Sequence, residues 1–189
     1  YVNDPNQTEH RSYYSMTYLG TPTWRRLRPQ ISEDLTVFGE GTDHTTYRNS
    51  SDFYARVLIR FPEGQAGTAW MGVRAVPTIT GTNLDGFRYD LTRNTDGTYT
   101  VAVRYSDPGT QELLYEGEAP RPDTGVYPAW MELMVVALHD RIAFFCNGKL
   151  VKVVLDVQWL GGTVALGVEP GTTAHFDDLL IRDTSPRGF

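Results

Sequence analysis

Five residues in the middle of the chain are of types that recognise a polar ligand. They are Trp70, Arg74, Arg88, Asp90 and Arg104. An indole ring offers a flat surface on which the C–H groups of a sugar can stack, while guanidinium and carboxylate groups form directional hydrogen bonds with hydroxyls or carboxylates. These residue types predict a ligand-binding surface. The alternative is a solvated face, or one covered by the N-terminal segment or another subunit, with ion pairs among the Arg and Asp side chains.

The elements that must position these side chains are three short strands. Residues 69–76, 86–93 and 99–106 each alternate with a period of two, which is typical of strands that turn one face toward a core. Met71, Tyr89 and Val103 fall on the apolar side. Because the connections between the segments are short, we expect the strands to be neighbours in one sheet. The five candidate residues would then share its polar face.

Other combinations of reactive side chains are not supported by the spacing. The four histidines are scattered, without an HExxH or paired metal-ligand pattern, and no nucleophile elbow is recognisable. The single cysteine, Cys146, stands beside Phe144 and Phe145, so we interpret it as a small buried side chain rather than a reactive thiol.

The segment 130–156 indicates the fold class most clearly. It contains three strand patterns joined by His139-Asp140 and by Asn147-Gly148, and the second pair is a strong signal for a type I′ hairpin. Residues 131–138 are apolar on both faces, which predicts that both are covered. About a dozen short strands and no long helical pattern predict an all-β protein, a two-sheet antiparallel sandwich.

Length and charge limit the organisation and the partners. A chain of 189 residues fits one domain, which we place at residues 23–183, between an N-terminal arm (1–22) and a short tail (184–189). A net charge of −6 argues against nucleic acid as a partner, and no apolar run is long enough for membrane insertion. The first residue is Tyr1 rather than Met, which we interpret as a sign of processing in a secreted protein, although a chain trimmed for recombinant expression would look the same.

The Tyr-rich segment 1–20 allows two interpretations. It is either a terminus that lies on the surface, or a strand that pairs with an open sheet edge of its own chain or of a neighbour. The second interpretation predicts self-association through residues 1–20.

The order of the strand patterns resembles the concanavalin A-like jelly rolls of lectins and glucanases, especially bacterial laminin G-like and 3-keto-disaccharide hydrolase domains. The resemblance covers roughly residues 24–183 and is most specific in the segments NGKLV, GGTVALGV and FDDLLI, which mark the fold rather than catalysis. It implies a curved jelly-roll sandwich whose concave sheet often binds glycans, and an extracellular or cell-surface location in bacteria.

The resemblance also implies where metal and catalytic groups would lie. In such jelly rolls the last strand often supplies an Asp to a structural Ca²⁺, which makes Asp177 and Asp178 candidate ligands, whereas an ion pair with Arg is the alternative. No other cofactor is expected. A retaining glucanase of this superfamily would carry an ExDxxE string, which this chain lacks.

We therefore expect a non-catalytic carbohydrate-binding, sensor or adhesion module whose partner is a glycan or polysaccharide. Two alternatives remain: a structural subunit of a surface filament or lattice that assembles through the arm, and a sugar-cleaving enzyme of the 3-keto-disaccharide hydrolase type.

Overall fold

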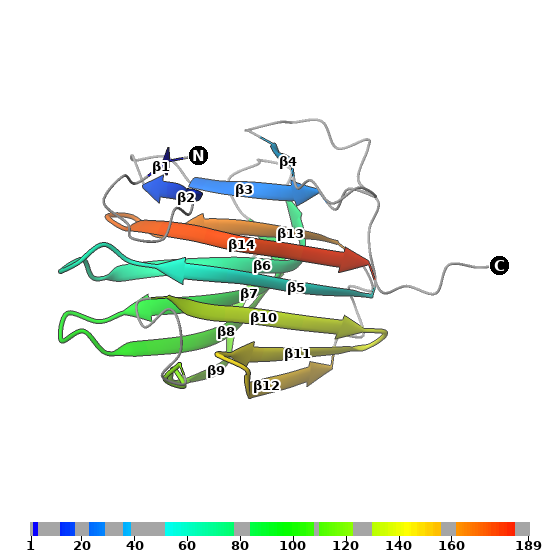
Figure 1. The fold of residues 1–189 in the computed structure, drawn as a ribbon. Coiled ribbons are helices and arrows are strands. Elements are labelled where there is room, and N and C mark those ends of the chain that lie inside the picture. Colours follow the sequence, from blue (N-terminus) through cyan, green and yellow to red (C-terminus); the bar gives the residue numbers. More distant parts are fainter. Residues whose placement is uncertain are drawn as a thin grey trace.

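The computed structural model describes residues 2–3, 12–17, 23–28, 36–38, 52–77, 84–107, 110–122, 130–155 and 162–183. Every regular element in these ranges is a strand, as the sequence patterns predict. The strands form two seven-stranded sheets that pack face to face (Figure 1). Every strand pairing between described residues is antiparallel, so the predicted all-β, two-sheet antiparallel sandwich is confirmed.

The strands of the first sheet, called the β5 sheet, come from both ends and the middle of the chain. In spatial order they are β1 (Val2–Asn3), β2 (Ser12–Thr17), β14 (Thr173–Asp183), β5 (Phe53–Arg60), β10 (Met131–Leu138), β11 (Arg141–Cys146) and β12 (Lys149–Leu155).

The strands of the second sheet, called the β6 sheet, include the three that carry the candidate residues. In order they are β4 (Thr36–Phe38), β3 (Thr23–Arg28), β13 (Thr163–Val168), β6 (Gly67–Pro77), β7 (Leu84–Arg93), β8 (Tyr99–Asp107) and β9 (Thr110–Glu118). The strands β6, β7 and β8 are direct neighbours, as the short connections predict.

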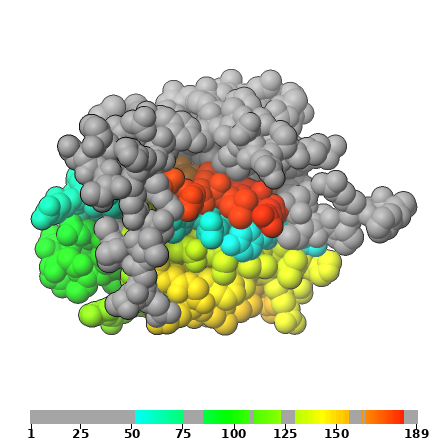
Figure 2. All heavy atoms as spheres, in the orientation of Figure 1, coloured from blue at the N-terminus to red at the C-terminus, as the bar shows by residue number. Residues whose placement is uncertain are grey.

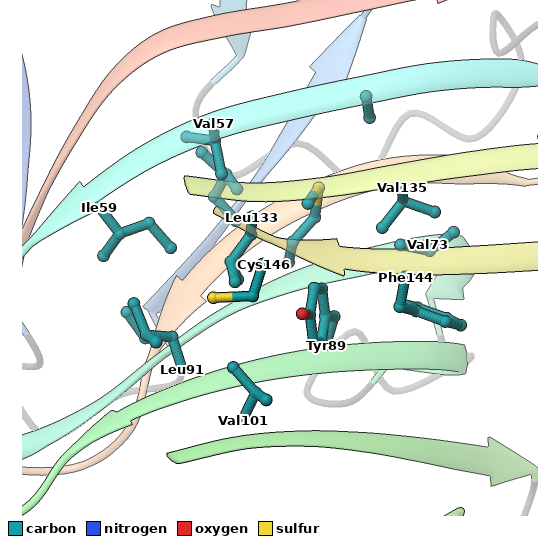
Figure 3. Close-up of a cluster of buried hydrophobic side chains, with 14 of the residues drawn as sticks. Val57, Ile59, Val73, Tyr89, Leu91, Val101, Leu133, Val135, Phe144 and Cys146 are labelled. Atoms are coloured by element: carbon teal, nitrogen blue, oxygen red, sulfur yellow. The ribbon is translucent and has the colours of Figure 1, made fainter. Parts of the chain in front are cut away.

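The core lies between the two sheets and follows the period-two patterns of the sequence. Alternate side chains of β5 and β10 are buried, as are those of β7 and β8 that face them (Figure 3). Tyr89 and Phe144 meet edge to face across the sandwich, with their ring centroids 5.2 Å apart. The apolar faces of the strands therefore supply the contact that holds the sheets together.

The β11–β12 hairpin has the predicted turn. Both Asn147 and Gly148 have positive φ angles, 48° and 72°. The Asn147 side chain also fixes the neighbouring chain, because its Oδ1 accepts a hydrogen bond from the Glu132 amide at 2.8 Å and its Nδ2 donates to the Pro120 carbonyl at 2.6 Å. One side chain therefore connects this turn to two other segments.

The outer side of β10 and β12 differs from the prediction that both faces of residues 131–138 are covered. Leu138 is 47% exposed, and Leu150, Val153 and Leu155 of β12 are exposed as well. Figure 2 views this outer side, where the yellow atoms of residues near 150 lie at the surface. On the outer face of β10, Met134 and Val136 are half-buried and Leu138 is exposed, so that face is covered only in part.

Part of the N-terminal arm is described, and it pairs within its own chain. Residues Tyr14 to Thr17 of β2 lie antiparallel to β14, and β1 continues the sheet beyond β2. Most of residues 1–22, and all of the tail 184–189, lie outside the described residues, so assembly through the arm stays a prediction. No described segment is a helix long and apolar enough to span a membrane.

Candidate functional site

Four of the five candidate residues lie together on the outer side of the β6 sheet, which is the more distant sheet in Figure 1. Trp70 of β6 pairs with Asp90 of β7, and Arg88 of β7 pairs with Arg104 of β8. Residues that are directly opposite in an antiparallel pair point to the same face. We call the surface formed by Trp70, Arg88, Asp90, Arg104 and the residues added below the polar face.

Asp90 is the electrostatic centre of the polar face. Its Oδ1 accepts from Nε of Arg88 at 2.5 Å, and its Oδ2 accepts from Nε of Arg104 at 2.9 Å. The Asp90 side chain is only 4% exposed, whereas those of Arg88 and Arg104 are 26% and 33% exposed. The two guanidinium groups compensate the negative charge of the buried carboxylate. The carboxylate in turn fixes the direction in which both arginine side chains point.

The ring of Trp70 packs against the Arg88 guanidinium of this cluster. The Cζ atom of Arg88 lies 5.1 Å from the centroid of the Trp70 ring, a distance at which cation–π attraction is significant. The indole also lies against Gly167 of β13, where an added Cβ would overlap it. Trp70 is only 7% exposed. Its ring therefore contacts Arg88 and does not present the open stacking surface that its residue type predicted.

Arg74 is not part of the polar face, and the prediction that it shares that face is wrong. The pairing of β6 with β7 shifts between Val73 and Val76, and Arg74 has a positive φ of 47° there. A bulge of this kind breaks the period-two alternation. The buried guanidinium instead donates from Nη2 to the carbonyl of His139, in the β10–β11 turn of the opposite sheet, at 2.5 Å.

The sequence did not single out Glu169 or the neighbouring threonines. Glu169, just after β13, forms an ion pair with Nη2 of Arg88. Its amide donates to the carbonyl of Thr68 at 2.9 Å, and the hydroxyls of Thr68 and Thr92 are 2.8 Å apart. Glu169 comes near Arg88 because of the register in which β13 pairs with β6. These strands are far apart in the sequence, so no local pattern predicts that register.

The polar face can bind hydroxyl groups through both donors and acceptors. Among the described residues, Arg104 has no partner other than Asp90, so its two terminal nitrogens are available as donors. Glu169 is 39% exposed and supplies acceptor oxygens, and Thr68 and Thr92 supply hydroxyls that act in both ways. Such a surface suits a ligand rich in hydroxyls.

The two aspartates predicted to bind calcium lie in β14, at an irregular point of its pairing with β5. Asp178 has a positive φ of 47°, and its amide donates to Oδ1 of Asp177 at 2.8 Å. Within the described ranges, no group of three or more His, Cys, Asp or Glu side chains is arranged to hold a metal ion. Because Ca²⁺ takes six to eight oxygen ligands, its binding here stays a prediction.

Two titratable groups in the core are held neutral. Burial raises the pKa of the Cys146 thiol to about 12, and the nearby Glu132 carboxylate adds to the shift. Burial also raises the pKa of the Tyr89 hydroxyl. Cys146 is a buried free cysteine, as its aromatic neighbours in the sequence predict. Neither group is accessible to a ligand.

Comparison with known proteins finds solved structures with a similar fold but no protein with a matching sequence. No family model matches the chain, and no curated protein matches its sequence. Among solved structures, carbohydrate-binding module CBM66 from Bacillus subtilis matches with a TM-score of 0.54 at 16% identity, over 86% of this chain and 97% of that one. Sheep galectin-11, solved with glycerol, matches with a TM-score of 0.51 at 12% identity, over 87% of this chain and 100% of that one.

Identities this low support a shared fold and nothing finer. The two antiparallel sheets, their strand order and these structural neighbours agree with one another. The chain therefore has the two-sheet antiparallel jelly-roll sandwich fold that these neighbours have.

Proposed function

We propose that this protein is a non-catalytic carbohydrate-binding module and that the polar face of the β6 sheet is its glycan-binding surface. The observation that carries the proposal is the arrangement around Arg104. Asp90 holds the guanidinium through Nε, while the two terminal nitrogens have no partner among the described residues. A donor pair that is fixed in direction and partly open to solvent binds a ligand at a small entropic cost.

The side chains around Arg104 supply the other hydrogen-bonding groups that a sugar needs. A sugar hydroxyl both donates and accepts hydrogen bonds, and the polar face offers the Arg104 donors, the Glu169 acceptor and the threonine hydroxyls within a few strand spacings. The names of the two structural neighbours, a carbohydrate-binding module and a galectin, support the same class of ligand.

The charged groups of the polar face favour binding over catalysis. Asp90 and Glu169 both contact Arg88, so both carboxylates serve in ion pairs. A retaining glycosidase instead places a general acid and a nucleophile about 5 Å apart on either side of the scissile bond. We further propose an adhesion or sensor role at the cell surface or outside the cell, where polysaccharides are encountered.

The test removes the Arg104 donors while Arg88 still pairs with Asp90. We expect Arg104→Ala to weaken binding to the glycans recognised on a glycan array by about tenfold or more, the loss typical of hydrogen bonds from a charged donor. The matched control is Arg141→Ala, because Arg141 is an exposed arginine at the start of β11 in the other sheet. Isothermal titration calorimetry would measure both variants.

The outcome that contradicts the proposal is equally direct. If Arg104→Ala binds as tightly as the unmodified protein, or if Arg141→Ala loses as much affinity, the polar face is not the binding surface. Trp70→Ala is a poor substitute for this test, because the ring is buried against Gly167 and its removal would leave a cavity.

A further inference from the structure

The distribution of charge around the polar face indicates which sugars it can accept. Glu116 and Glu118 of β9 border the face on the side opposite to Glu169. Glu116 lies opposite Ala102, which lies opposite Asp90, and Glu118 lies opposite Thr100, which lies opposite Thr92. Since each pairing keeps the side chains on one side of the sheet, both glutamates share the outer surface with Arg88 and Arg104.

We propose that the polar face selects uncharged sugars and rejects acidic ones such as uronic acids, an inference that rests on the proposed glycan-binding function. Two guanidinium groups, those of Arg88 and Arg104, lie among four carboxylates, those of Asp90, Glu116, Glu118 and Glu169. Within this group of six side chains, two positive and four negative groups give a formal charge of −2.

Both arginines, which this sum already includes, are engaged by carboxylates of the same face. Arg88 contacts both Asp90 and Glu169, and Arg104 contacts Asp90. A ligand carboxylate that approached the terminal nitrogens of Arg104 would come near Asp90 and Glu116. Diagonal neighbours on adjacent strands are about 7–8 Å apart, which is within the screening length of about 8 Å at physiological salt.

A neutral hydroxyl meets no such repulsion. Different hydroxyls of one glycan can accept from Arg104 and donate to Glu169 or to a threonine oxygen, so carboxylates that repel an acid serve as acceptors for an alcohol. Glu116 and Glu118 are both exposed, and no ion pair joins either of them to another described residue. Their charges therefore contribute to the potential that an approaching ligand experiences.

The experiment compares neutral and acidic polysaccharides on the full-length protein. The neutral probes are galactan, mannan, xylan, glucan and fructan, and the acidic probes are polygalacturonate, alginate and hyaluronan. We expect the best neutral probe to bind about tenfold or more tightly than any acidic probe at about 20 mM salt, and the ratio to shrink at about 500 mM salt as the charges are screened.

A charge-neutralising variant tests the cause of the selectivity. We expect the double variant Glu116→Gln, Glu118→Gln to raise the affinity for acidic probes relative to neutral ones by several-fold, whereas Glu63→Gln, at an exposed glutamate in the β5–β6 connection, leaves that ratio unchanged. Because both glutamates are exposed and the replacements are of the same size, the fold should be retained.

The results separate this inference from the proposed function. Acidic probes that bind as tightly as neutral ones at low salt, with binding that Arg104→Ala removes, would overturn the selectivity and leave glycan binding standing. An unchanged ratio in the double variant would also overturn it. Failure of every probe to bind would overturn the function and the selectivity together.

Discussion

At the scale of single residues, the site depends on a carboxylate that orients two arginines. Asp90 is 3% exposed and uses one oxygen for Arg88 and the other for Arg104. If it were removed, Arg104 would lose its only partner among the described residues, and the direction of its remaining donors would no longer be fixed. Affinity for a glycan and stability of the fold should therefore respond to the same side chain.

We expect Asp90→Asn to lower the free energy of unfolding by about 1–3 kcal/mol, because a nearly buried ion pair loses its charged acceptor. Glycan affinity should fall as well. Urea denaturation would measure the first effect and calorimetry the second. Asp140→Asn, at an exposed position in the β10–β11 turn, is the control, and an equal loss from both variants would refute the special role of Asp90.

The Cys146 thiol gives stability a pH dependence with a definite sign. Its pKa is about 12 in the folded protein, whereas the ordinary pKa of a thiol is 9.0, so the folded state holds the proton more tightly. This contribution is complete below the ordinary pKa and is lost as the pH rises toward the folded one. We expect the urea midpoint to fall between about pH 8.5 and pH 10.5.

The matched variant is Cys146→Ala, in which part of this slope should disappear, although Tyr89 titrates in the same direction at still higher pH. The buried thiol should also stay unreactive toward a thiol reagent at about pH 8 until the protein unfolds. Rapid labelling of the folded protein would contradict this account of the core.

At the scale of elements, periodicity predicted the strands and the faces of most residues. Trp70, Arg88, Asp90 and Arg104 share one face because β6, β7 and β8 are joined by short connections, so their neighbourhood is a local property of the sequence. Arg74 departs from the pattern because a bulge shifts the alternation after Val73. Gly72 lies in this stretch, and a glycine inside a strand often marks a bulge, but the sequence does not show at which residue the alternation shifts.

The solvent exposure of the site side chains was harder to predict than the face of the sheet to which they point. The packing of Trp70 on Gly167, and the contact of Glu169 with Arg88, both depend on how β13 pairs with β6. That register follows from the whole sandwich rather than from either segment. The type I′ turn at Asn147-Gly148 was predictable because only two adjacent residues determine it.

The same turn provides a prediction at this scale. We expect Asn147→Ala to destabilise the protein by about 1–3 kcal/mol, because the hydrogen bonds to Glu132 and Pro120 are lost and the positive φ becomes unfavourable. Asn147→Gly separates the two causes, since glycine tolerates the positive φ but lacks the side chain. Thermal unfolding of both variants would measure the difference, and a fully stable Asn147→Gly would show that the side-chain bonds are unimportant.

At the scale of the whole molecule, the sandwich places the polar face and the strands β1 and β2 in different sheets. The polar face belongs to the β6 sheet, whereas β1 and β2 extend the β5 sheet beyond β14 (Figure 1). Glycan binding at the polar face and assembly through β1 and β2 would therefore use different sheets.

We expect deletion of residues 1–20 to lower the melting temperature, because β14 loses its pairing with β2, while the affinity for glycan stays within about twofold. Light scattering of both forms would show whether residues 1–20 also support self-association. Loss of glycan binding in the truncated protein, with the fold retained, would contradict the independence of the two sheets.

The most direct measurement of the central claim is a nuclear magnetic resonance titration of the full-length protein with a glycan that binds on the array. We expect the perturbed amides to lie in β6, β7, β8 and around Glu169, and the Nε signals of Arg88 and Arg104 to shift. Perturbations confined to the β5 sheet, with both arginine signals unchanged, would contradict the claim.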